Sequence, residues 1–269
     1  MSEETSAGGG VLGFFLGLVI AGGIYFGVSM LFGASLMTAA IVAGIAAVIG
    51  AGYSAMAFSK KVYKAGFFSI LGYILDMSWS LLNTLAGFVV WIPAAKISGA
   101  DFIPPDSNSQ RSGTFVYNKN PRGGNYDATT IGTVIAGNPT GISQGGWCSH
   151  EELHVWQARI FGPGYMVAYI LALILNIPFR AITGKTENIT EEAYFRIPFE
   201  DWAYLAGLQS GADIKWGWWI VGFLLASVYT GALISIPVGI ALGILPLWLV
   251  GIGVLVIYSI IRAFTPKTQ

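Results

Sequence analysis

VLGFFLGLVIAGGIYFGVSMLF, residues 11–32, is an unbroken apolar run of the length that a helix needs to cross a bilayer. Further apolar runs follow at residues 35–58, 65–94, 216–239 and 240–263. The chain is 54% hydrophobic and only 10% charged, whereas a typical soluble domain carries about 25% charged residues. We therefore predict a mainly α protein, a polytopic membrane helix bundle with five full spans in the lipid bilayer.

The middle of the chain differs in character from its two apolar ends. Turn-forming residues recur between residues 96 and 149, and two β-branched or aromatic segments stand among them, at residues 113–118 and 128–136. They predict a small β-hairpin or sheet on one side of the bundle. The chain then divides into three regions: three membrane helices at 1–95, a middle domain at 96–215 and two membrane helices at 216–269.

Both histidines of the chain fall in one motif, HEELH, at residues 150–154. On a helix, positions i and i+4 lie on one face, so two imidazoles there can bind one Zn²⁺. The glutamate after the first histidine can then reach a metal-bound water and act as general base. The alternative is a polar helix start, with Ser149 as N-cap and Glu152 as its capping-box partner, which leaves both histidines unexplained. We predict a metal helix at about residues 149–161.

A catalytic zinc site usually has a third protein ligand and an open position for water. Because the motif uses every histidine, a carboxylate must supply this ligand. Pro198 suits the first position of a helix in which Glu200 and Tyr204 share a face, so we expect Glu200 as the ligand. Cys148, the only cysteine, could approach the metal, but a small buried thiol is the commoner role. The other downstream candidates are Glu187, Glu191, Glu192, Asp201 and Asp213.

With these residues the sequence resembles the gluzincin metalloproteases, which carry H-E-x-x-H on one helix and a Glu on a later helix. Within them it is similar to the membrane group of CAAX prenyl proteases and bacterial heat-shock membrane proteases, whose second motif is E-x-x-A-D. The chain has EDWAY at residues 200–204, so Tyr204 stands where that group has Asp. The continuation to Gln157 also looks like the H-E-x-x-H-x-x-Q variant of bacterial zincin-like domains. The resemblance covers about residues 110–210.

The resemblance implies a zincin-like metal-site domain and a role for each motif residue. His150, His154 and Glu200 would bind Zn²⁺. Glu151 would be the general base. The protein would then be a zinc metalloendopeptidase that cleaves membrane-associated peptides or membrane proteins, in a multi-pass arrangement in a prokaryotic inner membrane.

The resemblance also implies supporting roles. Tyr204 or Gln157 would orient a ligand or bind the oxyanion, and Tyr204 is therefore a candidate catalytic residue. The strand at residues 129–136 could present its edge to an extended peptide, although plain support of the metal helix is the favoured role.

A second class of function stays open: a non-catalytic membrane scaffold or assembly subunit with a structural or degenerate zinc site. The intact Glu151 favours the peptidase, because a structural site needs no base. Tyr204 in place of the Asp favours the scaffold, because that Asp supports a zinc ligand in the related group. The formal net charge of zero gives no indication of nucleic-acid binding.

Two features of the apolar runs bear on topology. Residues 165–179 are shorter than the roughly 20 residues that a span needs, so we expect a partial membrane segment there. Basic residues such as Lys60 and Lys96 flank spans on both predicted sides, so the positive-inside rule does not choose the side of the metal site. Asp76 lies at mid-depth in the third run, either as a functional carboxylate or bonded to neighbouring hydroxyls.

Overall fold

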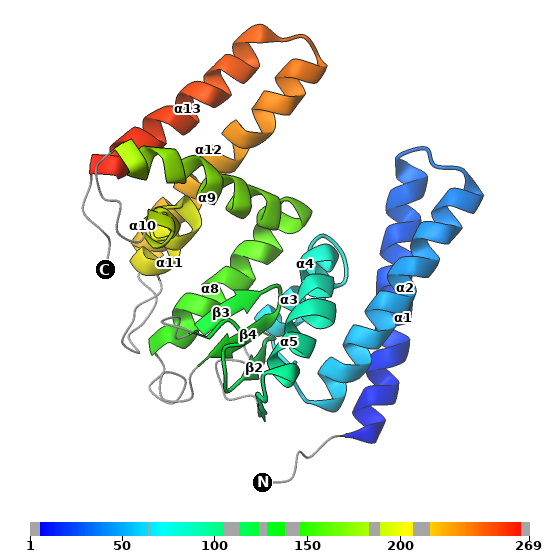
Figure 1. Ribbon diagram of the computed structural model, residues 1–269. Helices are drawn as coiled ribbons and strands as arrows, with labels where there is room; N and C mark the ends of the chain where they lie inside the picture. The colour runs from blue at the N-terminus through cyan, green and yellow to red at the C-terminus, as the bar shows by residue number, and fades with distance from the viewer. Residues whose placement is uncertain are drawn as a thin grey trace. The chain divides into compact units, whose positions relative to one another are not determined.

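The computed structural model describes residues 6–63, 65–104, 113–123, 128–137, 146–182, 189–206 and 216–264. These residues are mostly helical and include one small sheet, which confirms the predicted mainly α class (Figure 1). By its internal contacts the chain forms two compact units, Met1–Pro163 and Gly164–Gln269. This boundary falls inside the predicted middle domain, and the three-region division stays a prediction.

Among the described residues, five helices are long and apolar enough to cross a membrane, which is compatible with a multi-pass protein. They are Ala7–Leu31, Leu36–Ser59, His150–Pro178, Gly217–Ala241 and Leu245–Arg262. The third predicted run, residues 65–94, is not one straight span. Its helices α3 (Phe67–Asp76) and α4 (Leu81–Ala86, extended in helical form to Ile97) meet at an angle of 84°.

We expected a partial membrane segment at residues 165–179 because that run is short, but the helical stretch that contains it is longer. Gly162–Gly164 forms a 3-10 turn between α8 (Gly146–Phe161) and α9 (Tyr165–Ile182). Because the turn stays helical in character, the stretch from His150 to Pro178 is as a whole long and apolar enough to cross a membrane.

Small residues let α1 (Ala7–Leu31) and α2 (Leu36–Ser59) pack with their backbones close together. A Cβ atom on Gly17 would lie 2.1 Å from the carbonyl oxygen of Gly50, and one on Gly13 would lie 2.3 Å from that of Ser54. Both glycines are buried, whereas much of the rest of α1 exposes large apolar side chains. The glycines therefore set the distance between the two helices.

The sheet has four strands in the order β1-β2-β4-β3. The strands are β1 (Phe102–Ile103), β2 (Phe115–Tyr117), β3 (Ala128–Ile131) and β4 (Val134–Gly137), and only the β2–β4 pair is parallel. The predicted small sheet is confirmed, but the single strand expected at residues 128–136 is itself the β3–β4 hairpin. Gly132 turns it, with φ +58°, and a Cβ there would lie 2.0 Å from the carbonyl oxygen of Asn83. That close approach leaves room for glycine only.

Asp76, at the end of α3, has an arginine for its main partner. Its carboxylate forms a two-point ion pair with Arg159 of α8 and accepts a hydrogen bond from the Tyr63 hydroxyl at 2.5 Å. Burial and the nearby Asp76 carboxylate raise the pKa of Tyr63 well above its ordinary value, so this hydroxyl stays protonated and donates. A bond to hydroxyls was one of the two predicted alternatives, but the hydroxyl is that of Tyr63, outside the apolar run, and the arginine was not foreseen.

The second unit holds the remaining helices, which are α9, α10 (Ile189–Tyr194), α11 (Pro198–Ala206), α12 (Trp216–Ala241) and α13 (Leu245–Phe264). α11 begins at Pro198, as predicted from proline's preference for the first helical position. Asp201 of α11 forms an ion pair with Arg262 of α13 and accepts a hydrogen bond from Tyr258 at 2.9 Å. These contacts tie the helix that carries Glu200 to α13.

The packing of α1 on α2 predicts that Gly17→Val lowers the melting temperature of the detergent-purified protein. The expected cost is roughly 1–3 kcal/mol, because the new side chain must push two backbones apart. Gly27→Val is the matched control, since a Cβ on Gly27, in the same helix, meets nothing within 4 Å. Equal melting temperatures for the two variants would contradict the packing described here.

Candidate metal centre

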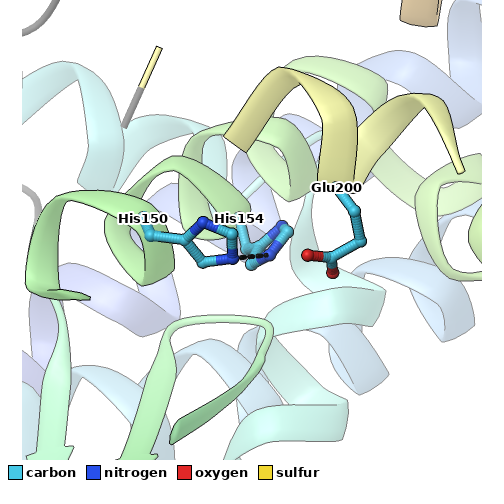
Figure 2. Close-up of side chains that lie close together, drawn as sticks. All are labelled: His150, His154 and Glu200. Atoms are coloured by element: carbon cyan, nitrogen blue, oxygen red, sulfur yellow. Dashed lines mark hydrogen bonds between the residues drawn. The ribbon is translucent and has the colours of Figure 1, made fainter. Parts of the chain in front are cut away.

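The two histidines of the motif lie on α8 and aim the same ring atom at one point. His150 and His154 are both buried, and their Nε2 atoms are 3.2 Å apart (Figure 2). Two imidazoles that bind one zinc tetrahedrally, with bonds of 2.0–2.1 Å, have nitrogens about 3.3 Å apart. The spacing of the pair therefore suits joint coordination of one ion.

Gln157 fixes the orientation of the second imidazole. Its side-chain oxygen lies 2.8 Å from Nδ1 of His154, and the whole residue is buried. An accepting oxygen there keeps the proton on Nδ1 and leaves the Nε2 lone pair for a metal. This contact is of the kind expected of Gln157 as a residue that orients a ligand.

Glu151 is held by a residue of the sheet. The Thr130 hydroxyl, on β3, donates to Oε2 of Glu151 at 2.5 Å, and the Glu151 residue is buried. The motif places Glu151 next to the first histidine, but nothing in the local sequence pairs it with Thr130. That contact exists because β3 lies against α8 in the folded chain.

Glu200 lies in the first turn of α11 and is fully buried. Its Oε1 accepts a hydrogen bond from the Tyr169 hydroxyl at 2.5 Å, and the ring of Tyr169 stacks on Phe199 with centroids 5.9 Å apart. Tyr169 was not among the predicted site residues. A tyrosine in the middle of an apolar helix was the signal that could have singled it out, because a buried hydroxyl usually has a polar partner.

Among the residues that the structure describes, His150, His154 and Glu200 form a buried group that could bind a metal ion. One ligand atom from each residue lies within 4.8 Å of the other two (Figure 2). These are the three residues predicted as ligands. Asp201, another predicted candidate, is engaged instead with Arg262 and Tyr258.

The other predicted site residues have different outcomes. Tyr204 is half-buried and its ring packs against Phe195 with centroids 5.7 Å apart, so its catalytic role stays a prediction. α8 begins at Gly146, so Ser149 lies inside the helix and the capping alternative is wrong. Several candidate ligands fall outside the described side chains: Cys148, Glu187, Glu191, Glu192 and Asp213.

No protein-family model matches the chain, and no curated protein or solved structure matches it. The metal-binding group and the side chains that hold it are therefore the basis for a functional proposal.

Proposed function

We propose that this protein is a membrane-integral zinc metallopeptidase in which Glu151 is the general base. The observation that carries the proposal is the buried His150, His154 and Glu200 group with a glutamate next to its first histidine. A structural metal site has no use for that glutamate. A hydrolytic site needs a base at this place to take the proton of a water.

Zinc is the favoured ion because two imidazole nitrogens and one carboxylate form a donor set typical of catalytic zinc sites with an open fourth position. When bound, zinc supplies a water with a pKa near 7 and a Lewis acid for the scissile carbonyl. Gln157 keeps His154 in the tautomer that can coordinate, and Tyr169 holds one oxygen of Glu200. Each contact orients a ligand without adding charge to the site.

Glu151 is restrained in a way that suits a base. Thr130 donates to its Oε2, so the rotamer of the carboxylate is set before any substrate binds. Oε1 is then the oxygen to which a proton is transferred. In the proposed reaction Glu151 takes the proton of the attacking water and passes it to the leaving amine.

The substrate class follows from the surroundings of the motif. Of the five described helices that could cross a membrane, two precede the metal-binding residues, one contains both histidines and two follow Glu200. We therefore favour apolar or membrane-tethered peptides and proteins as substrates, and a prokaryotic inner membrane as the location. These assignments rest on composition and on the resemblance of the two motifs to the CAAX prenyl protease and heat-shock membrane protease group.

The alternative is a non-catalytic scaffold or assembly subunit with a structural or degenerate metal site. The observation in its favour is Tyr204, which replaces the Asp of the related group and packs its ring on Phe195. A metal site without turnover would still keep its ligands and their hydrogen bonds. Peptidase assays on variants of Glu151 separate the two candidates.

The first prediction for the metal centre concerns the division of roles within the motif. Glu151→Gln should bind zinc and fold normally but lose proteolysis, because an amide cannot accept the proton of water. Glu152→Gln is the matched control and should keep activity, since it points about 100° further round the helix. Glu200→Ala should lose both zinc and activity. Zinc content and peptidase activity of the purified proteins are the measurements.

Identical proteolysis by wild-type protein and Glu151→Gln, with zinc in both, would contradict the peptidase proposal and favour the scaffold. Normal zinc content in Glu200→Ala would exclude Glu200 as a ligand, and Glu191 or Glu192 would be examined next.

A second prediction tests the orienting contacts. Gln157→Leu should weaken zinc binding about 10–100-fold, the usual effect of losing a hydrogen bond to a ligating histidine. Gln157→Glu keeps an accepting oxygen and should stay near wild-type affinity. Chelator competition measures both. If Gln157→Leu binds zinc as tightly as wild type, Gln157 does not orient a metal-bound His154.

The third prediction concerns metal removal. Stripping the protein with a zinc chelator should lower its melting temperature, and adding zinc back should restore it, because an ion that binds only the folded state stabilises it. The effect corresponds to about 2.7 kcal/mol when free zinc is 100 times its dissociation constant. Glu200→Ala should show no such response. A chelator-insensitive wild-type protein would argue against a resident ion.

A further inference from the structure

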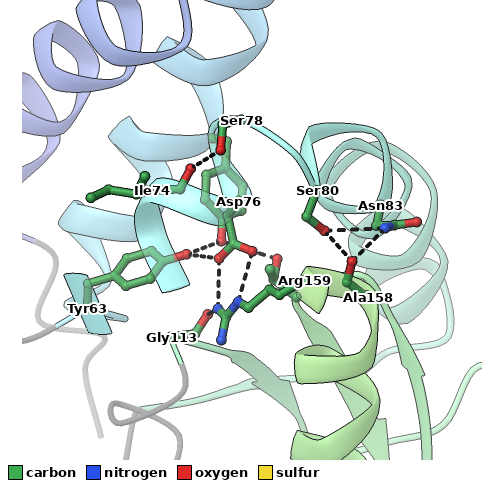
Figure 3. Close-up of polar contacts among 11 residues, drawn as sticks. Tyr63, Ile74, Asp76, Ser78, Ser80, Asn83, Gly113, Ala158 and Arg159 are labelled. Carbon is green, nitrogen blue, oxygen red and sulfur yellow. Dashed lines mark hydrogen bonds and ion pairs between the residues drawn. The ribbon is translucent and has the colours of Figure 1, made fainter. Parts of the chain in front are cut away.

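The bent segment between α3 and α4 caps the C-terminal end of the metal helix. Ser80 and Asn83 both donate to the carbonyl oxygen of Ala158, at 3.0 and 3.1 Å (Figure 3). Asn83 also donates to the carbonyl oxygen of Gly162 at 2.6 Å. The indole of Trp79 donates to a further α8 carbonyl at 3.0 Å. The last carbonyls of a helix have no partner within it, so these side chains supply what the helix lacks.

The ion pair between Asp76 of α3 and Arg159 of α8 is fully buried. Asp76 accepts from Nε of Arg159 at 2.9 Å and from Nη2 at 2.7 Å, so the two groups meet edge to edge (Figure 3). Nη2 also donates to the carbonyl oxygen of Gly113 at 3.3 Å. Gly72 of α3 leaves room for the guanidinium, since a Cβ there would lie 2.9 Å from its central carbon.

This pair is built for geometry more than for stability. Replacing a buried ion pair by well-packed apolar residues is often neutral or stabilising, so burial alone does not explain its presence. A two-point contact between planar groups fixes direction as well as distance, which a single hydrogen bond or an apolar contact does not. The direction fixed here is that of α8 relative to α3.

Arg159 can influence the metal ligands only through the helix. It follows His154 by five residues and therefore points about 140° away from it, at 100° per residue. A small rotation or slide of α8 would nevertheless swing both imidazoles away from their common point. The Thr130 contact to Glu151 restrains the first turns of α8, and the bent segment restrains its last turn.

We propose that Asp76 and Arg159 are positioning residues of the metal centre, whose ion pair fixes the rotation and axial position of α8 and hence the aim of His150 and His154. The inference rests on metal binding by the proposed site. It does not depend on peptidase activity.

The test uses the full-length protein, purified in detergent and loaded with Co²⁺, whose visible spectrum reports ligand geometry. The main variant is Asp76→Leu/Arg159→Met, which removes both charges together. It should keep a melting temperature near that of wild type. It should bind Co²⁺ about tenfold more weakly, an effect like that of losing a residue that hydrogen-bonds to a metal ligand, and its spectrum should change. Arg159→Lys, which keeps the charge but loses the two-point contact, should change the spectrum in the same direction.

Tyr73→Phe is the matched control. It removes a buried hydrogen bond of 2.8 Å between Ser54 and the same helix α3, one turn before Asp76, and leaves the described hydrogen bonds between α3 and α8 in place. Its cobalt spectrum and affinity should equal those of wild type. If the ion pair only stabilised the fold, the folded double variant would also have the cobalt spectrum and affinity of wild type.

A folded double variant with wild-type cobalt affinity and spectrum overturns the proposal. If that variant does not fold, Arg159→Lys and Asn83→Leu decide by the same two readouts, and wild-type behaviour in both overturns it. A wild-type protein that binds no Co²⁺ overturns both this inference and the metal centre. If cobalt binds normally but wild type and Glu151→Gln give the same proteolysis, only the peptidase proposal is contradicted.

Discussion

The ion pair between Asp76 and Arg159 fixes the junction of α3 and α8 in the described part of the first unit. Two charges are held in a fully buried place, where either one alone would be costly, roughly 3–5 kcal/mol if its partner is removed. The pair joins the end of α3 to the last turns of α8. The bend after α3, the capping of α8 by Asn83 and the close approach of Gly132 to Asn83 all occur around this junction.

A second constraint operates at the metal-binding group itself. Three of the four chemically active side chains have a neutral hydrogen-bond partner: Gln157 for His154, Thr130 for Glu151 and Tyr169 for Glu200. Neutral partners fix rotamers and tautomers while leaving the charge of the site to the ligands. Such support is what distinguishes a prepared site from three polar residues that happen to be close.

The local sequence identified most of the helices and the chemistry of the motif. The helices α1, α2, α12 and α13, which are long and apolar enough to cross a membrane, follow from uninterrupted apolar runs. The start of α11 follows from Pro198. These signals act within one element. The same holds for His150 and His154, whose spacing places them on one face of any helix. The choice of Glu200 took two further steps: the lack of another histidine required a carboxylate, and the helix predicted to begin at Pro198 favoured Glu200 among the carboxylates.

Sequence patterns did not predict the contacts between segments that lie far apart in the chain. The third apolar run is long enough to span, yet it bends by 84°, and the hairpin of β3 and β4 was read as one strand because Gly132 alone marks its turn. Asp76 with Arg159, and Thr130 with Glu151, are pairs separated by 83 and 21 residues. The sequence by itself determined which side chains can bind a metal and which stretches form helices, since both depend on local spacing. Only the tertiary structure decided which polar groups hold them in place, because a buried charge or hydroxyl takes whichever partner the packed chain brings within hydrogen-bond distance.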